Sequence, residues 1–423
     1  MSTPVAPTHL PQVELLPLKA GMLVGQAQEV TVLARITPPA PQLRAGARAP
    51  INLSLVLDRS GSMSGHPLEM ARQAAQTAIR ALEPQDRLSV VIFDDTVELL
   101  IAPQLVTDPE SLCRTVEGIT AGGSTALHAG WLEGATMTAQ HLNPEALNRV
   151  LLLSDGQANC GEQRPDVIAG HVRGLTARGV STSTVGLGRH YQEDLLRGMA
   201  DAGDGNFEHI EDAEALPAFF AAELQGFSRT VGRTVSLGIE PNPALQVSRV
   251  EVINSLIRND LGRYQLPNLI AERPLEVVFT LRVHAQPPQS SDVGVTRIRL
   301  AWTGRDGVRH SLRAQLNLPV LGADAYAALP ENSAVRLAEQ LLHNARAKQD
   351  AVQLLDAGNV AGAQLALNSR RRAFDEYAPL LPAPVAQQDA QALDDLAVNA
   401  DIDQTLTRKR ALSQSYNRSR SKD

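Results

Sequence analysis

The sequence predicts a doubly wound α/β domain that is inserted in a β-sandwich and followed by an α-helical region. Three changes of pattern along the 423 residues support this division. Strand-like and helix-like segments alternate from residue 51 to about 227, only strand-like segments follow from 231 to 318, and helical periodicity begins near 323. Alternating strands and helices are typical of a parallel sheet covered by helices, and uninterrupted strands are typical of a sandwich.

Composition limits the class of protein. The chain is 43% hydrophobic and 20% charged, as in ordinary globular proteins. Its formal net charge of −7 argues against a general nucleic-acid binder, because such proteins are usually basic. The two cysteines, Cys113 and Cys160, form no C-x-x-C pair, which favours a reducing cytoplasmic setting. We find no signal-peptide pattern, and no apolar run reaches the roughly 18 residues of a spanning helix, so we expect a soluble intracellular protein.

The N-terminal part contains two strand-like segments, at 12–16 and 29–36, after a loose arm at 1–9. Two strands cannot form a stable layer alone. We therefore expect 10–48 to supply strands to the sandwich formed by 229–321. The Pro- and Gly-rich stretch from 38 to 50 is typical of a linker, which makes the α/β domain at 49–228 an insertion.

Within 49–228, each element follows from apolar periodicity and turn residues. A short antiparallel strand is expected at one edge, at 97–102. The other strands are expected near 51–57, 88–93, 149–154 and 180–187, and the helices near 67–82, 109–117, 126–140, 165–178, 191–202 and 213–226.

The remaining elements divide into strands and helices. Strands are expected at 231–239, 245–253, 275–284, 293–303 and 308–318. Asn332 and Ser333 can cap a helix that runs to about 357, and further helices are expected at 360–377 and 386–399, so 322–400 is predicted to be a helical hairpin or small bundle. The basic, Ser-rich segment 401–423 is predicted to be a disordered tail, with a docking or phosphorylation segment as the alternative.

Polar side chains follow the first strand of the α/β domain. The apolar run 51–57 ends at Asp58, and Asp58, Ser60 and Ser62 alternate at a period of two. In an extended loop this spacing directs all three oxygens to one side. Ligands of open α/β sheets bind beyond the carboxyl ends of the strands. One carboxylate and two hydroxyls suit Mg²⁺, Mn²⁺ or Ca²⁺ better than zinc.

The segment Asp58-Arg59-Ser60-Gly61-Ser62 resembles the D-x-S-x-S motif of von Willebrand factor A (vWA) domains, where it forms a metal-ion-dependent adhesion site (MIDAS). That resemblance implies two further ligands, a Thr in a later loop that opens a helix and an Asp after a buried strand. Thr125, in Ala-Gly-Gly-Ser-Thr, and Asp155, after Val-Leu-Leu-Leu-Ser, match them. A bacterial intracellular vWA domain is therefore implied, with Mg²⁺ (or Mn²⁺ or Ca²⁺) held by Asp58, Ser60, Ser62, Thr125 and Asp155.

The alternative for these five residues is a set of turn and capping residues, for which Asp and Ser are favoured. Their joint occurrence at three predicted loops favours the metal site. Asp94 and Asp95 end the second strand. A place as outer-shell acids of the metal site is the alternative for them, but such residues are more often turn formers, and no role is predicted. His66 and His128 are expected to form neutral hydrogen bonds, and Cys160 is expected to be an unreactive thiol.

The resemblance implies a metal-dependent protein–protein interaction module, in which the ion coordinates an acidic side chain of a partner. Some bacterial relatives act beside AAA+ ATPases, so a scaffold or adaptor in a cytoplasmic complex is the first prediction. A metal-dependent hydrolase is the second, but the sequence lacks the G-x-S-x-G, Walker and H-E-x-x-H motifs. An RNA-binding protein is the third, although only the tail is basic. The sequence therefore predicts a binding protein and not an enzyme.

Overall fold

The computed structural model of this chain describes residues 10–40, 50–143, 146–188, 190–259, 261–288, 292–304 and 307–421. The chain divides into two compact units. One comprises Met1–Ala40, Thr234–Thr303 and Arg309–Asp423, and the other comprises Pro41–Arg233 and Gly304–Val308. The predicted arm at 1–9 and most of the predicted linker lie outside the described residues.

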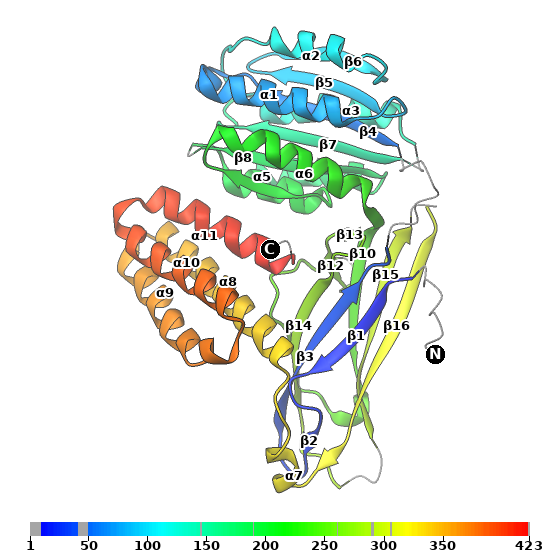
Figure 1. Cartoon of the computed structure of the whole chain (residues 1–423), viewed down its shortest axis with the longest axis vertical. Coiled ribbons are helices and arrows are strands. Elements are labelled where there is room, and N and C mark those ends of the chain that lie inside the picture. The colour runs from blue at the N-terminus through cyan, green and yellow to red at the C-terminus, as the bar shows by residue number, and fades with distance from the viewer. Residues whose placement is uncertain are drawn as a thin grey trace. The chain divides into compact units, whose positions relative to one another are not determined.

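The second of these units, the α/β unit, contains a six-stranded sheet in the order β6-β5-β4-β7-β8-β9 (Figure 1). Every neighbouring pair is parallel except β5 and β6, so the predicted antiparallel edge strand is confirmed. Strand β9 was not predicted, because its four residues are too few for a periodic signal. The bounds are β4 (Ile51–Asp58), β5 (Arg87–Phe93), β6 (Val97–Leu105), β7 (Leu147–Ser154), β8 (Val180–Leu187) and β9 (Phe207–Ile210).

Helices cover both faces of this sheet. Alternate strand residues such as Leu53 and Leu55 share one hydrophobic cluster with α1, α2 and α6. Val56 points the other way, towards Gly134 of α3, where an added Cβ would collide with it. The sheet is thus doubly wound, as predicted. The helices are α1 (His66–Ala81), α2 (Pro109–Glu117), α3 (Leu127–Gln140), α4 (Pro165–Thr176), α5 (Glu193–Ala202) and α6 (Leu216–Ser228), with short 3₁₀ turns η1 (Gly61–Met63) and η2 (Ala213–Ala215).

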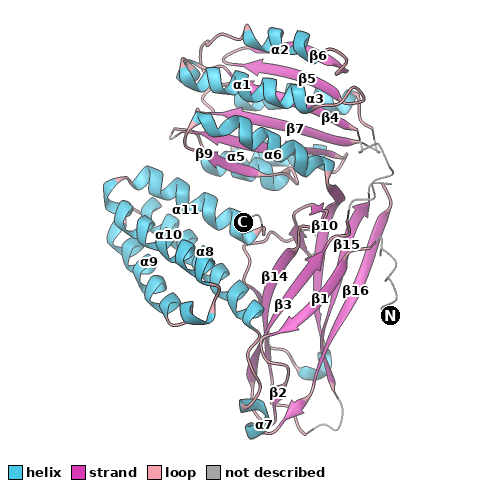
Figure 2. Cartoon of the chain, in the orientation of Figure 1, coloured by secondary structure: helices cyan, strands magenta, loops and turns pink. Residues whose placement is uncertain are grey.

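The other unit, the sandwich unit, contains a four-stranded sheet in the order β1-β3-β14-β11 and a five-stranded sheet in which β13 joins β12-β10-β15-β16 (Figure 2). Strand β3 pairs antiparallel with β14, with Ile36 opposite Leu275 and Gln28 opposite Val283. The N-terminal strands therefore lie in one sheet with strands from beyond residue 230. The bounds are β1 (Gln12–Pro17), β3 (Gln28–Thr37), β10 (Thr230–Pro241), β11 (Arg249–Val252), β12 (Tyr264–Leu266), β13 (Leu269–Ile270), β14 (Leu275–Val283), β15 (Val293–Gly304) and β16 (Arg309–Leu318).

Helices follow the last strands of the sandwich unit. The side chain of Asn332 accepts from the main-chain N–H groups of Ala334 and Val335, which confirms the predicted cap of α8. One face of α8 packs on the four-stranded sheet, in a cluster that includes Leu33 and Val278. None of the helices in the described ranges has the length and apolar character needed to cross a membrane. The remaining elements are a short parallel pair, β2 (Met22–Leu23) and β17 (Val320–Leu321), with 3₁₀ turns η3 (Pro243–Leu245) and η4 (Ala378–Leu380) and helices α7 (Ala323–Ala327), α8 (Ser333–Asp356), α9 (Val360–Asp375), α10 (Ala383–Ile402) and α11 (Gln404–Ser419).

The prediction of a disordered tail at 401–423 is wrong over α11. The side chain of Asp403 caps this helix by accepting from the N–H of Leu406. Leu412 is buried in a cluster shared with α8, α9 and α10, and Arg408 pairs with Asp356 of α8. The polar composition concealed a narrow apolar stripe at helical spacing, and contacts with the rest of the unit are enough to order the helix.

Candidate metal-binding site

The site begins at the carboxyl end of β4, where Asp58 is fully buried. The main-chain N–H of Ser60 donates to Asp58 Oδ1 at 2.8 Å, and the hydroxyl of Ser154, the last residue of β7, donates to Asp58 Oδ2. Both of these donors are neutral. Burial therefore dominates and raises the pKa of Asp58 from 3.8 to about 6, although the two hydrogen bonds partly oppose it.

Ser62 connects this loop to the one that follows β7. The hydroxyls of Ser60 and Ser62 lie 3.2 Å apart, and the Ser62 hydroxyl donates to Asp155 Oδ1 at 2.7 Å. Burial raises the pKa of Asp155, and the hydrogen bond from Ser62 lowers it. Ser62 is exposed whereas Asp58 and Ser60 are buried, so the group of oxygens is accessible to solvent from one side.

Thr125 joins the other residues from the loop that precedes α3. It is 3% exposed, and its N–H donates to Asn159 Oδ1 at 2.8 Å. Gly156 lies among the three loops. A Cβ added at Gly156 would lie 3.1 Å from Thr125 Oγ1, 3.6 Å from Ser62 Oγ and 3.7 Å from Asp58 Oδ2. The structure thus brings all five predicted residues together, three around this point and two through hydrogen bonds to them.

Arg59 and Asp94 fix the loops that carry these residues. Arg59 Nε lies 3.2 Å from Asp94 Oδ2, and the Arg59 carbonyl accepts from the N–H of Gly122 at 2.7 Å. Burial alone would raise the pKa of Asp94, but hydrogen bonds from Thr96 and the charge of Arg59 hold it below its usual range. A side chain at Gly122 would collide with the Asp94 carboxylate.

No role was predicted for Asp94, because an acid at the end of a strand is more often a turn former than an outer-shell acid. The available signal was the pair Gly122-Gly123, because adjacent glycines in a site loop often indicate close approach of another segment. The N–H of Gly61 donates to the carbonyl of Gly123 at 2.9 Å, so the loop with the D-x-S-x-S motif and the loop with Thr125 are in direct contact.

Two histidines near the site form other contacts. His66 Nε2 lies 3.0 Å from Glu214 Oε1, and His128 Nε2 lies 3.0 Å from His171 Nδ1. Burial, together with the neighbouring His171, lowers the pKa of His128. A neutral hydrogen-bonding role for His128, as predicted, agrees with this direction.

The donor set fits a hard divalent cation. Two carboxylates and three hydroxyls supply oxygen ligands of the kind that Mg²⁺, Mn²⁺ and Ca²⁺ prefer. A buried carboxylate whose hydrogen-bond donors are neutral is stabilised when a cation supplies the missing charge. The described ranges hold no group of three or more His, Cys, Asp or Glu residues arranged for a metal. Binding of an ion at the five residues would therefore depend on the hydroxyls.

Comparison with known proteins places the α/β unit in a family. The family model of the von Willebrand factor type A domain matches residues 52–222. The uncharacterized protein sll0103 of Synechocystis is 30% identical over 267 residues, which are 60% of this chain and 62% of that protein. Human inter-alpha-trypsin inhibitor heavy chain H3 is 30% identical over 45% of this chain and 22% of its own length. The chain thus spans less than two thirds of these relatives.

Two solved structures resemble almost the whole chain. A von Willebrand factor type A protein from Catenulispora acidiphila superposes with a TM-score of 0.70 at 16% identity, over 98% of both chains. The ArnB paralog VWA2 from Sulfolobus acidocaldarius has a TM-score of 0.59 at 16% identity, over 97% of this chain and 99% of its own. At this identity the likeness shows the fold alone. The family match identifies residues 52–222 of this chain as a von Willebrand factor type A domain, and the likeness in fold agrees with it.

Proposed function

We propose that this chain is a metal-dependent protein-binding module, in which Mg²⁺ (or Mn²⁺ or Ca²⁺) coordinates an acidic side chain of a partner. The convergence of oxygens from three loops around Gly156 carries the proposal. Domains of the vWA family are typically protein-interaction modules, and the exposed position of Ser62 leaves one side of the group open.

The residues that would hold the ion are Asp58, Ser60, Ser62, Thr125 and Asp155. When bound, a divalent ion supplies positive charge that oxygen donors neutralise. The vWA resemblance implies that only one of the two carboxylates contacts the ion directly while the other acts through water. The ion then keeps about one unit of positive charge, which favours a further carboxylate over a neutral group at an open position. Ser154 and the N–H of Ser60 hold the carboxylate of Asp58 in place, and Ser62 orients Asp155.

We also propose that the protein binds its partner without chemical turnover, as a scaffold or adaptor in a bacterial cytoplasmic complex. The cysteines Cys113 and Cys160 are both free thiols, which supports a reducing compartment. From the family resemblance, the partner class that we propose is an AAA+ ATPase.

The test is affinity capture with the full chain, in Mg²⁺ and in excess chelator. Wild type, Asp58→Ala and the control Asp166→Ala are compared, because Asp166 is an exposed acid in the first turn of α4. A partner retained by wild type and by the control in Mg²⁺, and lost in chelator and with Asp58→Ala, is the expected result. Replacing one Asp or Glu of that partner should abolish binding. Undiminished capture in chelator would mean that the partner binds elsewhere.

A further inference from the structure

Two histidines of the α/β unit face each other outside the five-residue metal site. His128 lies in the first turn of α3, and His171 lies in α4. His128 Nε2 is 3.0 Å from His171 Nδ1, and the centroids of the two rings are 5.1 Å apart. The oxygen atoms that surround Gly156 come from other residues, so the histidine pair is a separate feature of this unit.

Buried neighbours hold the two helices that carry these rings. Trp131, about one turn after His128, is fully buried, and its Nε1 donates to Thr182 Oγ1 at 3.1 Å. The centroid of the His128 ring lies 5.9 Å from that of Trp131. On α4, Val172 directly follows His171 and is fully buried. The two histidines are therefore attached to backbone that packing fixes, as a site formed before its ligand arrives requires.

The separation of the two ring nitrogens suits two ligands of one metal ion. At metal–nitrogen distances of about 2.0–2.1 Å and ligand–metal–ligand angles of about 90–109°, neighbouring ligands lie about 2.8–3.4 Å apart. The observed distance of 3.0 Å falls within this range. Rotation of the rings about their Cβ–Cγ bonds brings both lone pairs onto one point, and the exposure of His171 leaves room for it.

The environment of His128 favours the neutral ring that a metal ion needs, because a protonated imidazole has no lone pair to donate. Burial, together with the neighbouring His171, lowers the pKa of His128, so its neutral form dominates at pH 7. The charge of Glu162 acts in the opposite direction on His128. The carboxylate of Glu162, however, accepts hydrogen bonds from Arg164 Nε at 3.1 Å and Nη2 at 3.0 Å. A metal ion therefore has no proton to displace from His128 at neutral pH.

We propose that His128 and His171 form a binding site for a divalent transition-metal ion such as Zn²⁺ or Cu²⁺. Imidazole nitrogens suit these ions, whereas the oxygen ligands around Asp58 suit Mg²⁺. Within the described ranges no third His, Cys, Asp or Glu is arranged with the pair, so water or a partner fills the other coordination positions. A bound ion connects α4 to the start of α3, three residues after Thr125.

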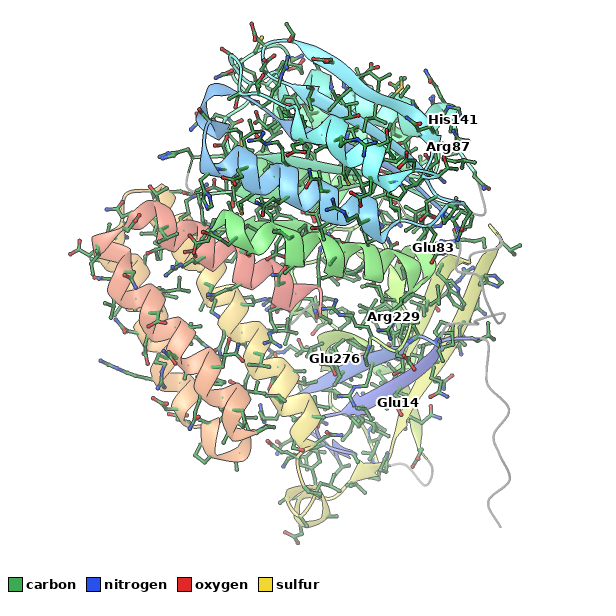
Figure 3. All side chains as sticks on the ribbon, turned by 45° about the horizontal axis from the view of Figure 1, so that its top comes forward. Glu14, Glu83, Arg87, His141, Arg229 and Glu276 are labelled. Atoms are coloured by element: carbon green, nitrogen blue, oxygen red, sulfur yellow. The ribbon has the colours of Figure 1, made fainter. Side chains whose placement is uncertain are left out.

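The test is a calorimetric titration of Zn²⁺ into the full chain, in saturating Mg²⁺ that competes for the five oxygen ligands. His128→Gln and His171→Gln keep hydrogen-bonding groups but lack the imidazole. The matched control is His141→Gln, at the exposed histidine after α3 that Figure 3 labels. Each variant of the pair should bind Zn²⁺ about tenfold or more weakly than wild type, because even the loss of a hydrogen-bond partner of a ligand costs about 10–100-fold in affinity. His141→Gln should bind as wild type does.

Electron paramagnetic resonance of the equimolar Cu²⁺ complex identifies the ligands directly. All chains carry Cys160→Ser, so that this free thiol does not reduce the ion. Coupling to two nitrogen nuclei is expected with both histidines present, and also in Asp58→Ala, which separates the pair from the five-residue site. Circular dichroism and the melting temperature establish that each variant is folded.

Three results would overturn the proposal. The first is the absence of saturable Zn²⁺ binding to wild type in Mg²⁺. The second is an equal loss of affinity in His141→Gln. The third is a Cu²⁺ spectrum whose coupling to two nitrogen nuclei persists when both His128 and His171 are replaced.

Discussion

The buried carboxylate of Asp58 should destabilise the metal-free protein at neutral pH, and Asp58→Asn should remove this effect. Asparagine keeps the size of the side chain and a carbonyl oxygen for the N–H of Ser60. The pKa of Asp58 rises from 3.8 to about 6 on folding. Each pKa unit corresponds to about 1.4 kcal/mol, so ionised Asp58 costs the folded state about 3 kcal/mol.

The sign of the pH dependence follows from the direction of the shift. The pKa of Asp58 is higher in the folded state, so the folded state binds this proton more tightly than the unfolded state. The contribution of Asp58 to stability is complete below about pH 4 and is lost as the pH rises through about 6. Metal-free Asp58→Asn should therefore be more stable than wild type at pH 7.5, by up to about 3 kcal/mol, and the difference should shrink towards pH 4.

Urea denaturation in chelator measures this difference. The chain has two tryptophans, and Trp131 lies in the α/β unit whereas Trp302 lies in the sandwich unit. A Trp302→Phe background therefore makes fluorescence a probe of the α/β unit alone. Saturating Mg²⁺ should raise the free energy of unfolding of the protein that has Asp58, and should leave that of Asp58→Asn unchanged.

Asp94→Asn is the matched control. Its carboxylate has a lowered pKa, held by Thr96 and Arg59, so its stabilising contribution is present at neutral pH and lost in acid. Asp94→Asn should therefore destabilise the unit at pH 7.5, opposite in sign to Asp58→Asn. A loss of stability in Asp58→Asn at pH 7.5 without metal, as large as that in Asp94→Asn, would refute the electrostatic argument.

Three further predictions concern other parts of the chain. Asp155→Ala should abolish the rise in melting temperature caused by Mg²⁺ and leave metal-free stability level or higher, because it removes a second partly buried carboxylate; calorimetry that finds a rise as large as in wild type would exclude Asp155 from the site. Gly130→Ala should cost about 1–3 kcal/mol in urea, because its Cβ would lie 2.5 Å from the ring of Phe93, whereas Gly170→Ala faces open space and should not destabilise. A chain that begins at Pro50 lacks β3, so proteases should cleave it within 230–320, and resistance there would show that β14 does not need this partner.

The elements that could be predicted are those whose own sequence specifies them. Strands β4 and β7 are short apolar runs that end abruptly at polar residues. The sequence therefore predicts that they are strands, and it places Asp58 and Asp155 at their carboxyl ends. Helix α8 carried its cap in Asn332 and a regular apolar face. That the N-terminal strands join the later strands followed from the instability of two strands alone, whereas the pairing of β3 with β14 was not predicted.

What was missed depends on contacts between distant residues. The ion pair of Arg59 with Asp94 joins two loops that no local pattern connects. Helix α11 is polar and basic, and its order depends on Leu412 and Arg408 meeting residues of other helices. The ion pair of Arg59 with Asp94 and the order of helix α11 both depend on tertiary contacts, which composition and periodicity do not reveal.

The pairing of β3 with β14 also sets an order of events during synthesis. Strand β3 ends at Thr37 and its partner begins at Leu275, so at roughly 5–20 residues per second the ribosome delivers β14 about 10–50 s after β3. During this interval the pair of β1 and β3 has two unpaired edges, of which that of β3 later pairs with β14, and it buries none of the apolar surface that it later shares with β14. The α/β unit, whose last helix α6 ends at Ser228, can fold in the meantime. Until β14 is made, the edge of β3 in a nascent chain is therefore open to pairing with a strand of another chain.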